Sequence, residues 1–325
     1  MNHVGVARLV LASLIVVGLA GCSSHTSTTT TTTAPSPTSR RATTTPAAQP
    51  PSFTEPCGHP GAPPATYDHV IWIWMENHPY DKVIGSRDAP ATSALAERCA
   101  TATDYRTVGR PSLPNYIGAT SGDTHGITDD GSPSVHRITS DNLFRQVRAS
   151  GGSERSYEED MPAPCALSSA GRYAVKHNPA AYYRGATDRQ ACRRDDVPLG
   201  TSTSGPFATG LESGHLPVFT FVTPNLCNDT HDCAVADGDA WLGRWMKVIL
   251  NSPTYRDGRT AVFVVWDEPT PMPDLVISPT TPAGARFDAP VDHYALLRTT
   301  EELLGLPRHL GAAATSPSLR RPFRL

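Results

Sequence analysis

The sequence predicts an α/β fold, a three-layer sandwich in which helices cover both faces of a mostly parallel sheet. Short, almost wholly apolar runs rich in β-branched and aromatic residues are typical of buried strands. Helical stretches of ten or so residues separate these runs, which is the pattern of βαβ units. Residues 57–325 are numerous enough to enclose one substantial core, so a single domain is expected.

The predicted elements alternate along the chain. Strands are predicted over residues 69–75 (HVIWIWM), 218–222, 261–266 and 274–278, and helices over residues 90–99, 114–120, 238–250 and 293–304. The first two helices have proline near the first turn, where its missing N–H is harmless. Residues 161–214 are rich in Pro, Gly and Ser, and they are predicted to form a loop-like insertion, a common location for substrate selectivity.

The N-terminus has the composition of an export signal. Arg8 precedes an apolar run that ends in small residues, and this run is too short to span a bilayer as a mature helix. The tetrapeptide Leu-Ala-Gly-Cys, which ends at Cys22, also has the pattern of a bacterial lipobox. It predicts removal of residues 1–21 and lipidation of Cys22; the alternative is an ordinary secretory signal with a coincidental cysteine.

Residues 23–56 consist mostly of Ser, Thr, Pro and Ala, with an unbroken run of threonine over residues 28–33. Such a segment cannot bury enough apolar surface to offset the entropy lost on ordering. We therefore predict that residues 22–56 are a lipidated cysteine with a flexible tether, and that the folded domain begins near Cys57.

Charge and cysteine content narrow the class of protein. The net charge is −3 with Lys and Arg scattered, which argues against a nucleic-acid binder with a basic face. Six of the seven cysteines remain after Cys22, an even number that favours disulfides in an exported protein. Pairing between sequence neighbours would join Cys57 to Cys99, Cys165 to Cys192 and Cys227 to Cys233. Because six cysteines allow 15 pairings, only the last pair, with its very short loop, is favoured.

Polar residues directly follow two of the predicted strands. Glu76 and Asn77 follow the first strand, and Asp267 and Glu268 follow the strand over residues 261–266. Ligands of open α/β sheets bind beyond the carboxyl ends of strands, and oxygen ligands suit hard or borderline cations. The two pairs are therefore candidate ligands of one metal ion; the alternative is that each strand simply ends in polar residues.

Ser112 lies just before a helix that has proline in its first turn. The free N–H groups and positive dipole end of a helix suit a phosphoryl oxygen or a developing alkoxide. A serine hydroxyl needs a general base or a metal to become a good nucleophile, so the metal and serine hypotheses support each other. The alternative is that Ser112 is only an N-cap.

Histidines are the remaining candidates for chemistry. Asp229 and His231 lie between Cys227 and Cys233, and a disulfide there would hold both in a tight loop; the alternative is a polar turn. His177 and His293 complete the set, although a single histidine is more often a satisfied surface or core residue.

Five segments in order resemble the bacterial phosphoesterases that include secreted acid phosphatases and phospholipases C, within the alkaline phosphatase superfamily. These segments are HVIWIWMENHPYDKVIG, RPSLPNYIGATSG, YAVKHNP, FVTPNLCNDTHDC with GDAWLGRWM, and VVWDE with DHYALLRTTEELLGLP. The resemblance spans nearly all of residues 69–307 and implies an alkaline-phosphatase-like fold. It implies that Ser112 attacks phosphorus and that a divalent metal ion of unknown identity is held by Glu76, Asn77, Asp267 and Glu268 together with Ser112.

Our hypothesis is a two-step reaction through a phosphoserine, in which a histidine among His177, His231 and His293 protonates the leaving alkoxide. Substrate contacts are predicted for Asn115, Lys176 and Asp229. Relatives often have histidine where this chain has Arg110, and an arginine there could bind phosphoryl oxygens.

The expected protein is a lipid-anchored, metal-dependent acid phosphatase at the outer face of the cell membrane. It would act as a monomer on phosphate monoesters of small molecules or lipids, such as phosphatidylinositol 3-phosphate. The alternatives are a phospholipase C-type phosphodiesterase and, from another class, a surface binding protein without turnover.

Overall fold

A computed structural model of the chain describes residues 49–185 and 187–325. The predicted signal peptide, Cys22 and most of the predicted tether lie outside the described residues. Within them, nine strands form one sheet in the order β4-β3-β5-β1-β6-β7-β2-β8, with β9 paired to β2. No helix in this part of the chain is long and apolar enough to cross a membrane.

The sheet is mostly parallel, as predicted. Neighbouring strands run parallel from β4 to β6, namely β4 (Asp196–Pro198), β3 (Glu154–Glu158), β5 (Phe219–Thr223), β1 (His69–Met75) and β6 (Thr260–Trp266). The next strand, β7 (Met272–Ile277), is antiparallel to both β6 and β2 (Ala100–Arg106). The short strands β8 (Ala285–Phe287) and β9 (Val291–Asp292) pair with β2 in parallel.

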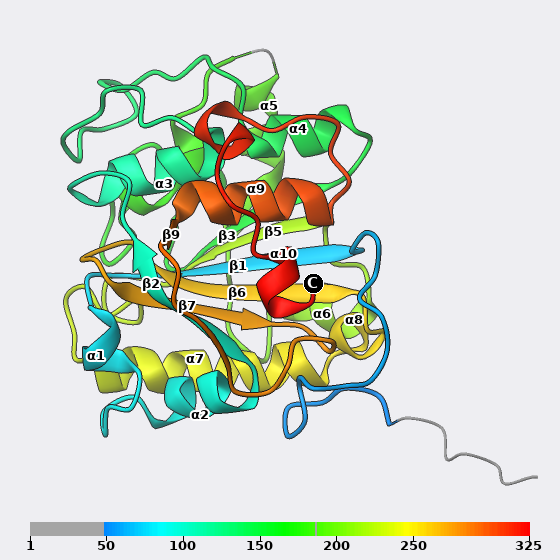
Figure 1. Cartoon of the computed structure of the whole chain (residues 1–325). Coiled ribbons are helices and arrows are strands. Elements are labelled where there is room, and N and C mark those ends of the chain that lie inside the picture. The colour runs from blue at the N-terminus through cyan, green and yellow to red at the C-terminus, as the bar shows by residue number, and fades with distance from the viewer. Residues whose placement is uncertain (1–48, 186) are drawn as a thin grey trace, which may run out of the picture. The chain divides into compact units, whose positions relative to one another are not determined.

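Helices lie on both faces of the sheet, so the predicted three-layer sandwich is confirmed (Figure 1). One layer contains α3 (Ser112–Ser121), α4 (Leu143–Ala149), α5 (Asp188–Asp195) and α9 (His293–Leu303). The other contains α2 (Pro90–Arg98), α6 (Pro206–Ser213), α7 (Val235–Asn251) and α8 (Pro253–Arg256). The remaining α-helices, α1 (Tyr80–Val83) and α10 (Arg320–Phe323), have four residues each, like α8.

The central strand β1 explains why these layers adhere. Its residues from Val70 to Met75 are all buried, because helices cover the sheet on both faces. A strand in this position is apolar throughout. Trp72 donates a hydrogen bond to Thr300 Oγ1 of α9 at 3.0 Å, and Trp74 packs against Tyr116 of α3 at a ring-centroid distance of 4.6 Å. Two tryptophans on one strand thus fix α3 and α9 over the strand whose end carries Glu76.

Three disulfides join the cysteines, and they are the pairs of sequence neighbours. Cys57 bonds to Cys99, Cys165 to Cys192 and Cys227 to Cys233. The last bridge closes the loop that carries Asp229 and His231, as its short spacing predicted.

Two predicted boundaries need correction. Residues 161–214 are not only a loop, because they contain α5, β4 and α6; their short length and polar composition hid them. The predicted tether also ends before residue 56, since Phe53 packs under the guanidinium of Arg98 and its N–H donates to Asn251 Oδ1 at 3.1 Å.

The side chain of Asp239 of α7 caps the N-terminus of α2. Substitution of Asp239 therefore tests the packing of these two helices. Its buried carboxylate accepts hydrogen bonds from the N–H groups of Ala91 and Thr92, at 3.0 and 2.7 Å, and from the Thr92 hydroxyl. We expect Asp239→Ala to lower the free energy of unfolding by roughly 2 kcal/mol, because these buried donors lose their acceptor. Urea unfolding measures this, with the exposed Asp288→Ala as the control that should unfold like wild type.

Candidate active site

The carboxyl ends of β1 and β6 meet because the two strands are parallel neighbours with Met75 opposite Trp266. Glu76 and Asp267 therefore leave the sheet side by side. Asn77 has a φ of 56°, a left-handed conformation that asparagine tolerates, and its N–H donates to Asp267 Oδ1 at 3.1 Å. The predicted meeting of two strand ends is thus present in the structure.

Ser112 lies at this meeting point, in the first turn of α3. Its hydroxyl donates to Glu76 Oε2 at 3.0 Å, and its side chain is almost fully buried. Tyr116, one helical turn further on, donates a short hydrogen bond to Glu76 Oε1. Both oxygens of Glu76 are therefore held by hydroxyl groups of one helix face.

Several carboxyl groups are buried close together in the site. Burial, followed by repulsion from Asp267 and Asp229, raises the pKa of Glu76 well above its ordinary value. Burial also raises the pKa of Asp267 and of Asp229 to about 7. Within the described residues, the buried oxygens Asn77 Oδ1 and Asp267 Oδ2 have no hydrogen-bond partner. Unpaired oxygens among crowded carboxylates are the donor set that a divalent cation would satisfy.

His177, in the short helix η1 (Val175–His177), lies on the other side of Glu76. Its Nε2 is 3.3 Å from Glu76 Oε1 and its Nδ1 is 3.3 Å from Asp229 Oδ2, and its ring stacks on Tyr116. Complete burial lowers the pKa of His177 well below its ordinary value. The residue is thus a buried imidazole held between two carboxyl groups.

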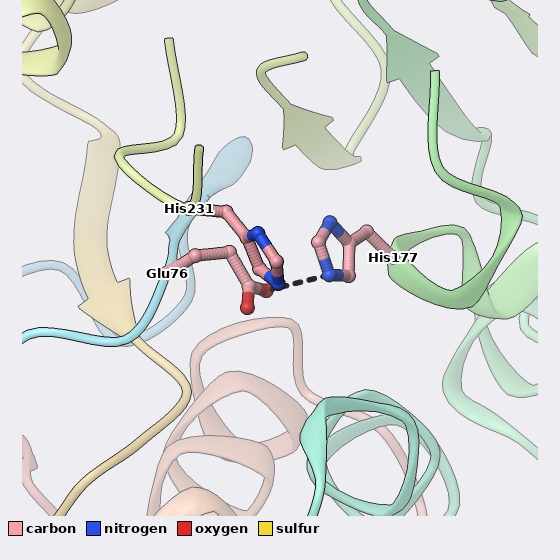
Figure 2. A group of neighbouring side chains, drawn as sticks. All are labelled: Glu76, His177 and His231. Atoms are coloured by element: carbon pink, nitrogen blue, oxygen red, sulfur yellow. Dashed lines mark ion pairs between the residues drawn. The ribbon is translucent and has the colours of Figure 1, made fainter. Parts of the chain in front are cut away.

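His231 faces the same space from the disulfide-closed loop. Figure 2 shows the side chains of Glu76, His177 and His231 pointing toward one another. Each offers one possible ligand atom, and these three atoms lie within 4.8 Å of one another. His231 Nδ1 lies 2.7 Å from Asp232 Oδ1, and its Nε2 lies 3.4 Å from the ammonium of Lys176. These three side chains could hold a metal ion, but a cation on His231 Nε2 would face that ammonium. This side of the site is therefore better suited to an anion.

The loop between the two bridged cysteines is tied to the end of β1. Glu76 N–H donates to Asp229 O at 2.8 Å, and Thr230 Oγ1 donates to Glu76 O at 2.9 Å. Asp229 Oδ1 accepts from His231 N–H at 2.7 Å. The buried carboxylate of Asp229 thus contacts both His231 and His177, so it positions these two histidines.

Two other predicted site residues have roles that the structure contradicts. His293 is buried behind the site, with Nδ1 paired to Tyr105 Oη at 2.9 Å and Nε2 to Asp267 O at 3.1 Å, so neither ring nitrogen is free for a leaving group. Asn115 is also buried, and its amide is occupied by the loop before Ser112: Oδ1 accepts from Val108 and Gly109 N–H, and Nδ2 donates to Gly109 O and Pro111 O.

Glu268 and Arg110 lie at the rim. Glu268 is partly exposed, and burial is the main reason that its pKa is raised. The exposed Arg110 has its Nε 3.8 Å from Glu268 Oε2. The arginine therefore neutralises this carboxylate at the entrance.

Sequence reasoning missed Tyr116 and Asp130. Tyr116 could have been found, because it is four residues after Ser112 and so shares its helix face. Asp130 lies in an irregular loop and gave no signal, yet its Oδ1 accepts from Leu113 N–H at 3.0 Å and its Oδ2 from Lys176 Nζ at 2.9 Å.

The chain is similar in sequence and fold to known phosphoesterases. The Phosphoesterase family model matches residues 83–296. The phosphatidylinositol-3-phosphatase of Mycobacterium tuberculosis is 31% identical over 263 residues, covering 78% of this chain and 82% of that protein. The phosphate-repressible acid phosphatase of Penicillium chrysogenum is 27% identical over 74% of this chain, which spans 60% of the fungal protein. A solved protein of the alkaline phosphatase superfamily from Vibrio parahaemolyticus shares the fold, with a TM-score of 0.52, 13% identity and coverage of 87% and 77% of the two chains.

Proposed function

The chain belongs to the phosphoesterase family and is a phosphoric ester hydrolase, and on that premise we propose that it is an exported, metal-dependent acid phosphatase acting through Ser112. One observation carries the proposal. The Ser112 hydroxyl, at the start of a helix, donates to a glutamate that shares a buried cluster with Asp267. A serine held only as an N-cap would have no need of this surrounding set of unpaired oxygens.

The metal ligands in this proposal are Glu76, Asn77, Ser112, Asp267 and Glu268. The unpaired Asn77 Oδ1 and Asp267 Oδ2, together with the raised carboxyl pKa values, fit a bound divalent cation. When bound, such an ion would favour the ionised serine hydroxyl and offset charge on the phosphoryl oxygens.

In the first step, Ser112 Oγ forms a bond to phosphorus while the bond from phosphorus to the leaving oxygen breaks. Glu76 Oε2 already accepts the hydroxyl hydrogen bond, so it is positioned to receive the proton. When substrate is bound, Lys176 and the N–H groups at the start of α3 would donate to the phosphoryl oxygens. The product of this step is a phosphoserine and an alcohol.

His231 is the proposed acid for the leaving alkoxide. Its ring is partly exposed at the mouth of the site, whereas His177 is fully buried. Asp232, next to His231 Nδ1, stabilises the protonated imidazole that must form. In the second step water attacks phosphorus, returns a proton to the site, releases inorganic phosphate and regenerates the Ser112 hydroxyl.

The proposed substrates are phosphate monoesters, including phosphorylated lipids. The name of the Mycobacterium tuberculosis relative, a phosphatidylinositol-3-phosphatase, supports testing phosphoinositides first. Three disulfides support an oxidising compartment outside the cytoplasm. We further propose that Cys22 carries the lipid anchor, and that the chain acts as a monomer without nucleic acid.

A substrate panel tests this proposal. We expect phosphate release from p-nitrophenyl phosphate and phosphatidylinositol 3-phosphate to exceed cleavage of a phosphocholine diester by at least about a hundredfold in kcat/KM. The physical reason is that a dianionic monoester gains more from the positive charge of Lys176 and of a bound metal ion than a monoanionic diester does. Preferred cleavage of the diester would instead support a phospholipase C, and binding of all substrates without turnover would support the binding protein.

A further inference from the structure

The carboxylate of Asp130 accepts hydrogen bonds from two donors at the mouth of the active site. Its Oδ1 accepts the N–H of Leu113, the residue after Ser112, at 3.0 Å, and its Oδ2 accepts from Lys176 Nζ at 2.9 Å. The side chain of Asp130 is 29% exposed, so one carboxylate bridges a helix amide and an ammonium from the solvent side. Lys176 Nζ also lies 3.4 Å from His231 Nε2, and Leu113 directly follows Ser112 in α3.

We propose that Asp130 is an internal competitor of the substrate: its carboxylate holds the phosphoryl pocket and must be displaced when a phosphate group binds. This inference rests on the proposed function, and it adds a residue that sets the affinity for phosphate. Asp130 acts on binding and release, and it takes no part in bond making.

The geometry of the contact matches the ligand that it would replace. Two oxygens on one carbon bridge the Leu113 amide and the Lys176 ammonium, as two oxygens on one phosphorus could do. A phosphate group carries more charge than a carboxylate and can in addition reach the Ser112 side of the pocket. It can therefore displace Asp130, and Asp130 can return when phosphate is the product.

The backbone around Asp130 permits this movement. Among the described residues, those from 128 to 131 make no backbone–backbone hydrogen bond. The segment is held by the Tyr182 hydroxyl, which donates to Gly131 O at 3.0 Å, and by the side chain of Asp129. The Asp130 carboxylate can thus rotate toward solvent without breaking a strand or helix.

An internal carboxylate has a functional consequence for turnover. Glu268, His177 and His231 also border the pocket. Among the described residues, however, only Asp130 bridges Leu113 and Lys176 with a carboxylate. After hydrolysis this carboxylate competes with inorganic phosphate for the same two donors. The enzyme should therefore release product readily and show weak inhibition by phosphate.

The test is the affinity for inorganic phosphate, measured by titration calorimetry on the metal-loaded enzyme and by competition against p-nitrophenyl phosphate. We expect Asp130→Asn to bind phosphate roughly tenfold more tightly, because the isosteric amide cannot form the ion pair with Lys176. The matched control is Asp257→Asn, since Asp257 is an exposed carboxylate that precedes β6, at the end of the strand opposite Asp267. It should bind phosphate as wild type does.

A double-mutant cycle separates competition from a general effect of charge. In a Lys176→Met background, Asp130→Asn should change phosphate affinity by less than about twofold, because the ion pair that Asp130→Asn removes is already absent. Equal tightening in both backgrounds, unchanged affinity in Asp130→Asn or weaker binding would each overturn the inference. If wild type turns over monoesters while any of these results is found, the proposed function stands without the inference. If no variant binds phosphate and wild type shows no turnover, both fail.

Discussion

Replacing Ser112 with alanine is expected to lower kcat for p-nitrophenyl phosphate by at least about a thousandfold while leaving the fold intact. In the proposed mechanism this hydroxyl forms the phosphoenzyme, and its loss removes the bond-forming atom. The substitution removes the hydrogen bond to Glu76 Oε2. The other carboxylate oxygen of Glu76, Oε1, still accepts from Tyr116. The Tm of Ser112→Ala should therefore differ little from that of wild type, and the substitution should act on kcat alone.

The matched control lies at the other end of the same helix. Ser121 is also buried, and its hydroxyl donates to Ile117 O at 2.8 Å and to Asp123 O at 2.9 Å. Ser121→Ala removes the same atom from α3 without touching the carboxylate cluster, so it should retain wild-type kcat. Wild-type activity in Ser112→Ala would remove the nucleophile from the mechanism.

The covalent intermediate offers an independent measurement. Wild-type protein quenched in acid during turnover should yield a phosphorylated peptide that contains Ser112, and Ser112→Ala should not. A phosphorylated peptide from another part of the chain would assign the nucleophile elsewhere.

The fold could be predicted where apolar periodicity was strong. The strand over residues 69–75 has the bounds of β1, because six consecutive buried residues leave little choice of conformation. The neighbouring β2 (ATATDYR) and β3 (ERSYE) were missed, since their polar residues hide strands that are set by pairing with β7 and β5. Their positions are decided by tertiary contacts that local sequence does not record.

The site shows the same division between local and long-range information. Glu76, Asp267 and Ser112 could be identified because each directly follows or begins a recognisable element. The histidines could be found but not ranked, since the difference between His231 and His293 is whether the ring faces the pocket or Asp267 O. Asp130 is 18 residues beyond Ser112 in an irregular loop, and only the folding of the chain brings it to Leu113 and Lys176.

The second large effect is expected from Asp267→Asn, which should lower metal affinity and kcat together. Asp267 Oδ2 is buried without a hydrogen-bond partner, so it is the oxygen that a cation would most directly satisfy. Elemental analysis after dialysis against a chosen divalent metal should give less than about a tenth of the wild-type metal content, since a charged ligand is lost. This measurement is independent of catalysis.

In the metal-free protein, Asp267→Asn should increase thermal stability. Burial raises the pKa of Asp267 to about 7 in the folded state, above the unfolded value of about 3.9. A raised carboxyl pKa stabilises the folded protein only while the group is protonated, so this contribution is full below about pH 4 and is lost as pH rises to about 7. Metal-free Asp267→Asn should therefore have a higher Tm than metal-free wild type at pH 8, and the difference should vanish near pH 4.

A control separates ligand chemistry from burial of charge. Asp274 of β7 is also fully buried, both its oxygens have no partner within the described residues, and burial raises its pKa to about 8. Asp274→Asn should raise the Tm of the metal-free protein in the same way, yet keep wild-type metal content because it is not among the proposed ligands. If Asp267→Asn also keeps its metal, the two strand ends do not form the cation site, and Ser112 must be activated by its protein neighbours alone.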